Sequence, residues 1–169
     1  VTPERRSTVL LAILLLNLPF VAGLIYVPLV AINSLIVFLL LSIFYSAWPI
    51  RAKSKPFVDS AFNILYLMPG VFAYAMIAGE LPPWQVIVAG GLWTAAMHAY
   101  SAVPDIDVDR EANVSTIATG LGANLTVALC AVLYLAAAFL AAEFLGFVAI
   151  PLGFAYLVLM LASFRPIKT

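Results

Sequence analysis

The chain alternates long apolar runs with short polar segments. From Ser7 to Ile50 no residue is charged, and this run is too long for one bilayer crossing, which needs about 20 residues. The stretch Tyr26-Val27-Pro28 is the natural break in it, because proline interrupts a helix. The pattern therefore predicts two helices in this run, over residues 8–26 and 29–48.

The rest of the chain predicts four further helices from the lengths of its apolar runs. A turn from Gly79 to Pro83 and a polar stretch from Asp105 to Thr119 interrupt these runs. The expected spans are then 8–26, 29–48, 60–78, 84–103, 121–142 and 145–164. We therefore predict an all-α fold, a six-span transmembrane helical bundle that forms a single domain over residues 1–169.

Composition supports a membrane environment. The chain has 169 residues, of which 65% are hydrophobic and 9% are charged, whereas soluble domains carry about 25% charged residues. The formal net charge is +0, which gives no indication of a nucleic-acid partner, and we expect none. Cys130, the one cysteine, lies within an apolar run and is expected to be a small buried hydrophobic residue.

Some polar and small residues fall inside the predicted spans. Polar side chains within a membrane span tend to face the protein interior, so Asn17, Asn33 and Asn63 are expected to be buried between helices. The pair Gly90-Gly91 predicts a close approach of two helices. We therefore expect these residues to serve helix packing rather than chemistry.

The positions of the basic residues predict the orientation in the membrane. With six crossings all eight fall on one side, and the opposite loops carry only Glu80 and Glu143. Lysine and arginine are enriched in cytoplasmic loops, so we expect an integral protein of the cell membrane with both termini and both polar loops in the cytoplasm. The basic residues are Arg5, Arg6, Arg51, Lys53, Lys55, Arg110, Arg165 and Lys168.

One cytoplasmic loop is acidic. Asp105, Asp107, Asp109 and Glu111 lie within seven residues at the end of a predicted span. If the preceding helix continues, Asp105 and Asp109 share one face and can hold Mg²⁺, which prefers oxygen ligands. Asp107 and Glu111 have the same spacing, so spacing alone does not select the pair. A solvated loop in which Asp107 pairs with Arg110 is the alternative.

The other cytoplasmic loop, residues 45–59, is basic. Arg51 presents a planar fork for phosphate oxygens, Lys53 adds a mobile charge, and the two prolines Pro49 and Pro56 stiffen the loop. A juxtamembrane anchor that meets anionic lipid headgroups is the alternative.

Aromatic residues and one histidine lie near these loops. Tyr45, Trp48 and Tyr100 have ring faces that can stabilise a cation, although an interfacial belt or packing role also explains them. His98 either touches the site or forms a hydrogen bond with a neighbouring helix.

The two loops together fit a magnesium-bound diphosphate whose apolar tail lies among the helices. This chemistry indicates prenyl transfer, in which the diphosphate departs and a second apolar substrate captures the allylic cation. A transporter, which would need charged residues along its path, and a non-catalytic scaffold are the alternatives from other classes.

Two motifs carry a family resemblance. The first is Asp105-x-x-x-Asp109 with Arg110-Glu111, Thr116, Thr119 and Gly120-Leu121-Gly122, and the second is Tyr45-Ser46 with Pro49, Arg51, Lys53, Pro56 and Asp59. Both resemble the UbiA superfamily of intramembrane prenyltransferases, which are nine-span helical bundles. The resemblance implies Mg²⁺ as cofactor, Asp105 and Asp109 as its catalytic ligands, and diphosphate binding by Arg51, Lys53, Tyr45 and Arg110.

The chain departs from that family by lacking its first acidic motif, its first two spans and its last span. The family's first acidic motif is Asn-Asp-x-x-Asp-x-x-x-Asp, and the sequence does not contain it. When the polar loops are aligned with those of the family, the six predicted spans correspond to the family's third to eighth spans. With Val1 at the start, we expect an internal fragment that is inactive by itself.

A narrower resemblance concerns the acceptor. Residues 98–112 are similar to the lycopene elongases of carotenoid biosynthesis, which transfer prenyl units from dimethylallyl diphosphate to lycopene. An aromatic, quinone-precursor or lipid acceptor stays open.

Overall fold

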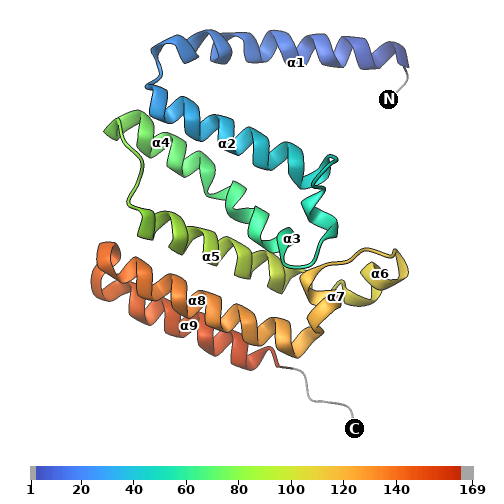
Figure 1. Ribbon diagram of the computed structural model, residues 1–169, viewed down its shortest axis with the longest axis vertical. Coiled ribbons are helices and arrows are strands. Elements are labelled where there is room, and N and C mark those ends of the chain that lie inside the picture. The colour runs from blue at the N-terminus through green and yellow to red at the C-terminus, as the bar shows by residue number, and fades with distance from the viewer. Residues whose placement is uncertain (1–2, 165–169) are drawn as a thin grey trace.

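The fold consists of helices joined by short turns (Figure 1). The computed structural model describes residues 3–164, and the side chains from residue 5 onward. Within that part of the chain no strand occurs, which confirms the predicted all-α class. The α-helices are α1 (Pro3–Gly23), α2 (Leu29–Ser46), α3 (Val58–Ala61), α4 (Met68–Ala78), α5 (Trp84–Ser101), α6 (Ile106–Glu111), α7 (Ile117–Leu121), α8 (Ala123–Leu145) and α9 (Ala149–Ala162).

Short 3-10 segments join several of these helices. They are η1 (Leu24–Tyr26), η2 (Ala52–Ser54), η3 (Phe62–Tyr66) and η4 (Gly146–Val148). The segment η3 links α3 to α4, so residues 58–78 form one nearly continuous rod. The helix expected over residues 60–78 therefore begins two residues earlier and contains a tighter turn near its start.

The long helices run back and forth across the molecule (Figure 1). The loop after α2, the pair α6 and α7, the start of α1 and the end of α9 all lie at the right-hand end of that view. The turns between α1 and α2, α4 and α5, and α8 and α9 lie at the opposite end. Both polar segments thus share one end of the bundle, which is called the polar end below.

Four stretches of the described chain are long and apolar enough to cross a membrane, namely Arg5–Tyr26, Leu29–Ser46, Val58–Ala78 and Ala123–Ala162. The last of these contains the hairpin of α8 and α9. Helix α5 falls outside this set because polar side chains such as Gln85, Thr94 and His98 lower its mean hydropathy. The protein is an integral membrane protein, and the division into six spans stays a prediction.

Helix contacts depend on small residues. A side chain at Gly153 of α9 would place its Cβ 2.4 Å from the Cβ of Ala138 in α8, so these helices meet closely there. The predicted close packing at Gly90 and Gly91 is confirmed, because a Cβ at either position would approach Leu67 or Ile64, respectively, within 3.1 Å. The main helix pairs are α2 with α4, α5 with α8, and α8 with α9.

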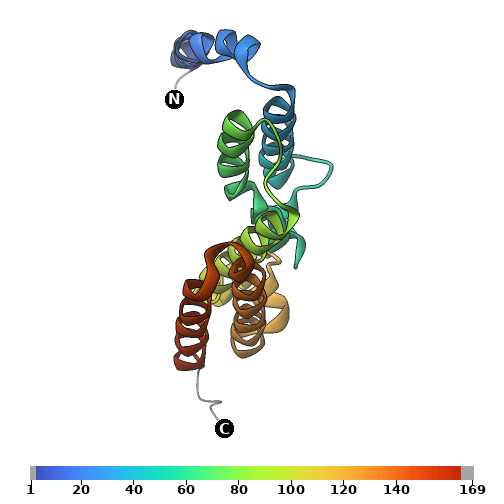
Figure 2. The same ribbon diagram turned by 90° about the vertical axis from the view of Figure 1, so that its left-hand side faces the viewer.

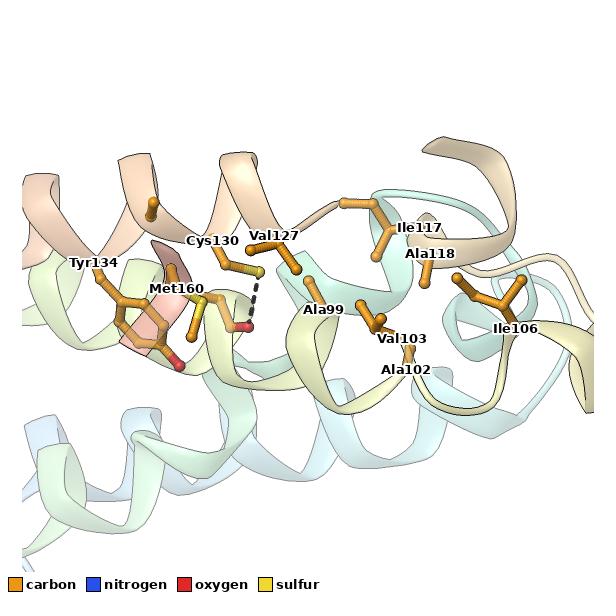
Figure 3. Close-up of a cluster of buried hydrophobic side chains, with 12 residues drawn as sticks. Ala99, Ala102, Val103, Ile106, Ile117, Ala118, Val127, Cys130, Tyr134 and Met160 are labelled. Carbon is orange, nitrogen blue, oxygen red and sulfur yellow. Dashed lines mark hydrogen bonds between the residues drawn. The ribbon is translucent and has the colours of Figure 1, made fainter. Parts of the chain in front are cut away.

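The buried core lies in the second half of the chain (Figure 3). Side chains from α5, α7 and α8, with Met160 from α9, form one cluster that also includes Ile106 of α6. Cys130 is completely buried in this cluster, as predicted, and its thiol donates a hydrogen bond to the Ala96 carbonyl at 3.3 Å. Ile117 anchors the start of α7 to the same cluster.

Helix α1 lies apart from the other long helices in both views (Figures 1 and 2). Its apolar side chains are exposed, for example Leu14 at 68% and Phe20 at 76%. The expected burial of Asn17 and Asn33 is wrong, because both side chains lie on exposed helix faces. Asn63 is buried as predicted, at 1% exposure.

Candidate functional site

The polar end is built around a buried carboxylate. Asp59 lies in α3 and has no exposed surface. One of its oxygens, Oδ1, accepts a hydrogen bond from the Ser60 backbone N–H at 2.8 Å, and Oδ2 accepts one from the Ile117 backbone N–H at 3.0 Å. A buried carboxylate is tolerated when its oxygens are hydrogen-bonded. Asp59 therefore ties the basic loop's end to the start of α7.

Other side chains surround this carboxylate. His98 Nε2 of α5 lies 3.8 Å from Asp59 Oδ2, so the histidine faces another helix's polar group. The Tyr45 ring meets the His98 ring edge-on, with 6.4 Å between centroids. Asn63 donates to the Asp59 carbonyl at 2.6 Å. Tyr45 thus belongs to the Asp59 cluster and is half-buried.

The acidic segment does not continue the preceding helix, which was the condition for placing Asp105 and Asp109 on one face. Helix α5 ends at Ser101, and a separate helix, α6, begins at Ile106. Pro104 explains this break, since proline disfavours helical backbone in the residue before it. Asp105 is the N-cap residue of α6, and the Asp109 backbone N–H donates to its carbonyl at 2.8 Å. The two aspartates keep their one-turn spacing, but the helix that carries it is α6 and not α5.

The two candidate metal ligands differ in burial. Asp105 is exposed, whereas Asp109 is half-buried. The Thr116 hydroxyl approaches Asp109 Oδ2 at 3.5 Å, the outer limit of a hydrogen bond. Thr116 also caps α7, because its hydroxyl accepts from the Thr119 backbone N–H at 3.2 Å. Asp109 therefore lies beside the same capped turn that Asp59 holds.

Asp107 and Arg110 form a separate arrangement. Asp107 Oδ1 and Arg110 Nη1 are 4.0 Å apart, and both side chains are mainly exposed, so the expected alternative pairing is present but weak. They line a cavity of about 340 Å³ next to the start of α8. Arg110 is thus directed to a different part of the segment from Asp109.

The basic loop presents its charges to solvent. Arg51, Lys53 and Lys55 are exposed and make no ion pair with any carboxylate in the part of the chain that the structure describes. Arg51 adopts a left-handed backbone conformation with φ 45°, and its N–H donates to the Ala47 carbonyl at 2.8 Å. These cations are therefore available for an anionic partner.

Whether a Mg²⁺ ion fits this site depends on the oxygen ligands that the side chains offer. Among residues 3–164 no group of three His, Cys, Asp or Glu side chains could hold a metal ion together. Mg²⁺ is commonly held by one or two carboxylates, with waters and substrate phosphates completing its coordination. Asp105 and Asp109, one turn apart and both oxygen donors, fit that pattern.

An apolar cavity lies farther along the bundle. It has a volume of about 460 Å³ and is lined by α5, α8 and α9, including Trp93, Tyr134 and Tyr156. Tyr134 and Tyr156 stack with 4.3 Å between their ring centroids. Its lining comes from the first half of α5 and the second half of α8, so it lies on the side of the core away from α6 and α7.

The prediction gave no role to the residue at the centre of this site. Asp59 was expected in a polar loop, but the structure buries it at the start of the stretch Val58–Ala78. The signal was present, because an acidic residue that opens an apolar run usually has a specific partner. The roles of Arg51, Lys53, Tyr45, Arg110, Asp105 and Asp109 stay predictions.

The family of this chain follows from its match to a protein-family model. The model described as the UbiA prenyltransferase family matches residues 3–167. The chain belongs to this family. The two motifs that the structure brings to one end are thus parts of a UbiA-family chain, and its helical architecture agrees with a membrane bundle.

Known relatives within the UbiA family share part of their length with this chain. The lycopene elongase/hydratase of Haloarcula japonica is 46% identical over 112 residues, which are 66% of this chain and 38% of that protein. The protein of the same name from Haloferax volcanii is 47% identical over 98 residues, 58% and 33% of the two chains. That from Corynebacterium glutamicum is 39% identical over 99 residues, 57% and 34%.

The matched region thus spans between a third and two fifths of these curated relatives. No solved structure matches the chain.

Proposed function

We propose that the protein transfers a prenyl group from dimethylallyl diphosphate to lycopene, with Mg²⁺ as cofactor, in carotenoid biosynthesis. The observation that carries the proposal is the Asp59–Ile117 hydrogen bond, which joins the basic loop to the acidic segment within a UbiA-family chain. A magnesium diphosphate needs cations for its phosphates and carboxylates for its metal at one place.

Each charged group then has a defined task. Arg51 and Lys53 bind diphosphate oxygens, and the family resemblance assigns the same task to Tyr45 and Arg110. Asp105 and Asp109 hold Mg²⁺, which when bound neutralises charge on the departing diphosphate. Thr116 supports Asp109 through its hydroxyl.

The reaction breaks one bond and forms another. The C–O bond between the allylic carbon and the diphosphate breaks, and the diphosphate keeps the electron pair. The π electrons of an acceptor double bond then form the new C–C bond, and the resulting cation loses a proton or gains water. Oxygen ligands and fixed cations at the polar end favour the first step by stabilising the leaving group.

The second substrate is apolar, and two observations support that choice. The cavity between α5, α8 and α9 is lined almost entirely by apolar surface, including Trp93 and Tyr156. Three relatives named lycopene elongase/hydratase align with this chain at 46%, 47% and 39% identity.

The orientation belongs to the same proposal. Both polar segments lie at one end of the bundle, with Arg51, Lys53, Lys55 and Arg110 (Figure 1). Because basic loops remain in the cytoplasm, we place this end on the cytoplasmic side of the cell membrane, in contact with its lipid. Arg165 and Lys168, which were predicted on the same side, lie outside the described residues.

An acceptor assay tests the proposal. Membranes that contain the complete gene product receive labelled dimethylallyl diphosphate and either lycopene or an aromatic quinone precursor. Label in the lycopene fraction is expected. Label only in the aromatic product would leave the family's chemistry intact and overturn the acceptor, while solute flux without any prenyl product would overturn the enzyme.

A further inference from the structure

The hydrogen bonds of Asp59 connect two parts of the chain that are far apart in sequence. Asp59 Oδ1 bonds within its own turn, to the Ser60 N–H, whereas Oδ2 reaches the N–H of Ile117, which is 58 positions later. The carboxylate is fully buried, so water does not compete for either bond. The bond to Ile117 therefore fixes the start of α7 relative to α3.

The donor in this bond is a group that needs a partner. Ile117 is the first residue of α7, and N–H groups in the first turn of a helix have no partner within the helix. The Thr116 side chain already accepts from Thr119. Asp59 accepts from the N–H of Ile117 and so contributes to the cap of α7 from outside the helix.

This capped turn reaches a proposed metal ligand. Thr116 precedes Ile117, and its hydroxyl lies 3.5 Å from Asp109 Oδ2. The Val114 backbone N–H also donates to the Asp109 carbonyl at 2.8 Å. A displacement of residues 114–117 would therefore move the surroundings of Asp109 directly.

We infer that Asp59 is a positioning residue that sets the place of Asp109 through Ile117 and Thr116. The inference rests on the proposed function, because it takes Asp109 to be a ligand of Mg²⁺. It adds that the buried aspartate at the end of the basic loop controls metal affinity without touching the metal. Outer hydrogen-bonding partners of metal ligands commonly change affinity by about 10- to 100-fold when they are removed.

The donor side offers a clean test. Ile117→Pro deletes the N–H that Asp59 accepts, and proline is well tolerated at the first position of a helix. Thr116 has φ −114° and ψ 169°, the extended conformation that a residue before proline prefers. Ile117→Val is the matched control, because it trims the same buried side chain and keeps the N–H.

The acceptor side gives the second pair of variants. Asp59→Leu removes both acceptors, while Asp59→Asn keeps one oxygen for the Ile117 N–H. Thr94→Val is a control for the loss of a buried polar group, since the Thr94 hydroxyl donates to the Gly91 carbonyl of its own helix and not to the polar end. If Asp59→Leu does not fold, the comparison of Ile117→Pro with Ile117→Val tests the inference by itself.

Two readouts in the complete gene product separate positioning from general damage. One is the Mg²⁺ concentration for half-maximal prenyl transfer, and the other is Mn²⁺ binding, followed by electron paramagnetic resonance with inorganic diphosphate present. Ile117→Pro and Asp59→Leu are expected to weaken both by about tenfold. Asp59→Asn should weaken them less, and Ile117→Val and Thr94→Val should match the wild type. The KM for the apolar acceptor should not change.

The result distinguishes this inference from the proposed function. Wild-type Mn²⁺ binding in folded Ile117→Pro, together with loss of binding in Asp109→Asn, would overturn the role of Asp59 alone. Wild-type binding and activity in Asp109→Asn would overturn the metal site itself. Equal losses of Mn²⁺ binding in Ile117→Pro and Ile117→Val would show that the Ile117 side chain acts by packing and that its N–H bond to Asp59 does not set metal affinity.

Discussion

The Asp59 carboxylate accepts a hydrogen bond from the Ile117 backbone N–H at 3.0 Å, inside the protein and across 58 positions of sequence. This bond brings the end of the basic loop against the turn that follows the acidic helix α6. Any function assigned to either polar segment must therefore account for both.

Arg51 tests the diphosphate role of the basic loop. Arg51→Gly removes the guanidinium at a position whose φ of 45° favours glycine, so the backbone turn is retained. We expect the KM for dimethylallyl diphosphate to rise about tenfold, the effect of losing a charged hydrogen bond of about 1.5 kcal/mol.

The matched control for Arg51 lies in the same loop. Lys55→Ala removes an exposed cation that has no assigned role in diphosphate binding. An equal rise in KM for both variants would indicate a general electrostatic effect of the loop and contradict a specific role for Arg51.

The apolar cavity predicts where the acceptor binds. Ala141 lines it, whereas the neighbouring Ala142 does not. Ala141→Phe should therefore raise the KM for lycopene several-fold and leave the KM for dimethylallyl diphosphate unchanged. Steady-state kinetics of this variant beside Ala142→Phe checks the prediction, and equal effects of the two would argue against the cavity.

Close packing of α8 and α9 predicts a loss of stability. A Cβ at Gly153 would meet the Cβ of Ala138 at 2.4 Å. Gly153→Ala should lower the free energy of unfolding by about 1–3 kcal/mol, as expected for overpacking. Thermal denaturation in detergent, followed by circular dichroism, measures this. Gly70→Ala is the control, since its Cβ would meet nothing within 4 Å, and an equal loss there would contradict the packing argument.

Thiol labelling tests the orientation in the membrane. The native Cys130 is fully buried, so labelling of a cysteine introduced at an exposed position can be distinguished from labelling of Cys130. In intact cells an impermeant maleimide should label the Glu80→Cys variant but not the Lys55→Cys variant. After the membrane is permeabilised, it should label Lys55→Cys as well. The reverse pattern would place the polar end outside.

The apolar pattern predicted the helices well because a bilayer requires long uninterrupted helical stretches. It did not predict the separate helix α6, since residues 105–119 were read as a polar stretch after the span 84–103 and a helix there was considered only as a continuation of that span. Asn17 and Asn33 were expected to be buried, but burial depends on neighbouring helices, and their faces of α1 and α2 have none in residues 3–164. Spacing within one helix contains no information on such neighbours.

The candidate site shows the same limit more sharply. The charges of Arg51, Lys53, Asp105 and Asp109 are visible as clusters in the sequence, so the two polar segments could be recognised. Asp59 is a single acid at the edge of an apolar run, and its partner is a backbone N–H in a distant segment. Only the fold brings that donor and acceptor together.

The most direct test of the central claim compares two aspartates of α6. Asp109 is the proposed metal ligand, whereas Asp107 is exposed and pairs weakly with Arg110. Prenyl transfer from labelled dimethylallyl diphosphate to lycopene is measured with Asp109→Asn and Asp107→Asn in the complete gene product. We predict that Asp109→Asn loses at least about 100-fold in rate, a barrier increase of about 3 kcal/mol, while Asp107→Asn stays within about twofold of the wild type. Undiminished transfer in Asp109→Asn would contradict the proposed metal site.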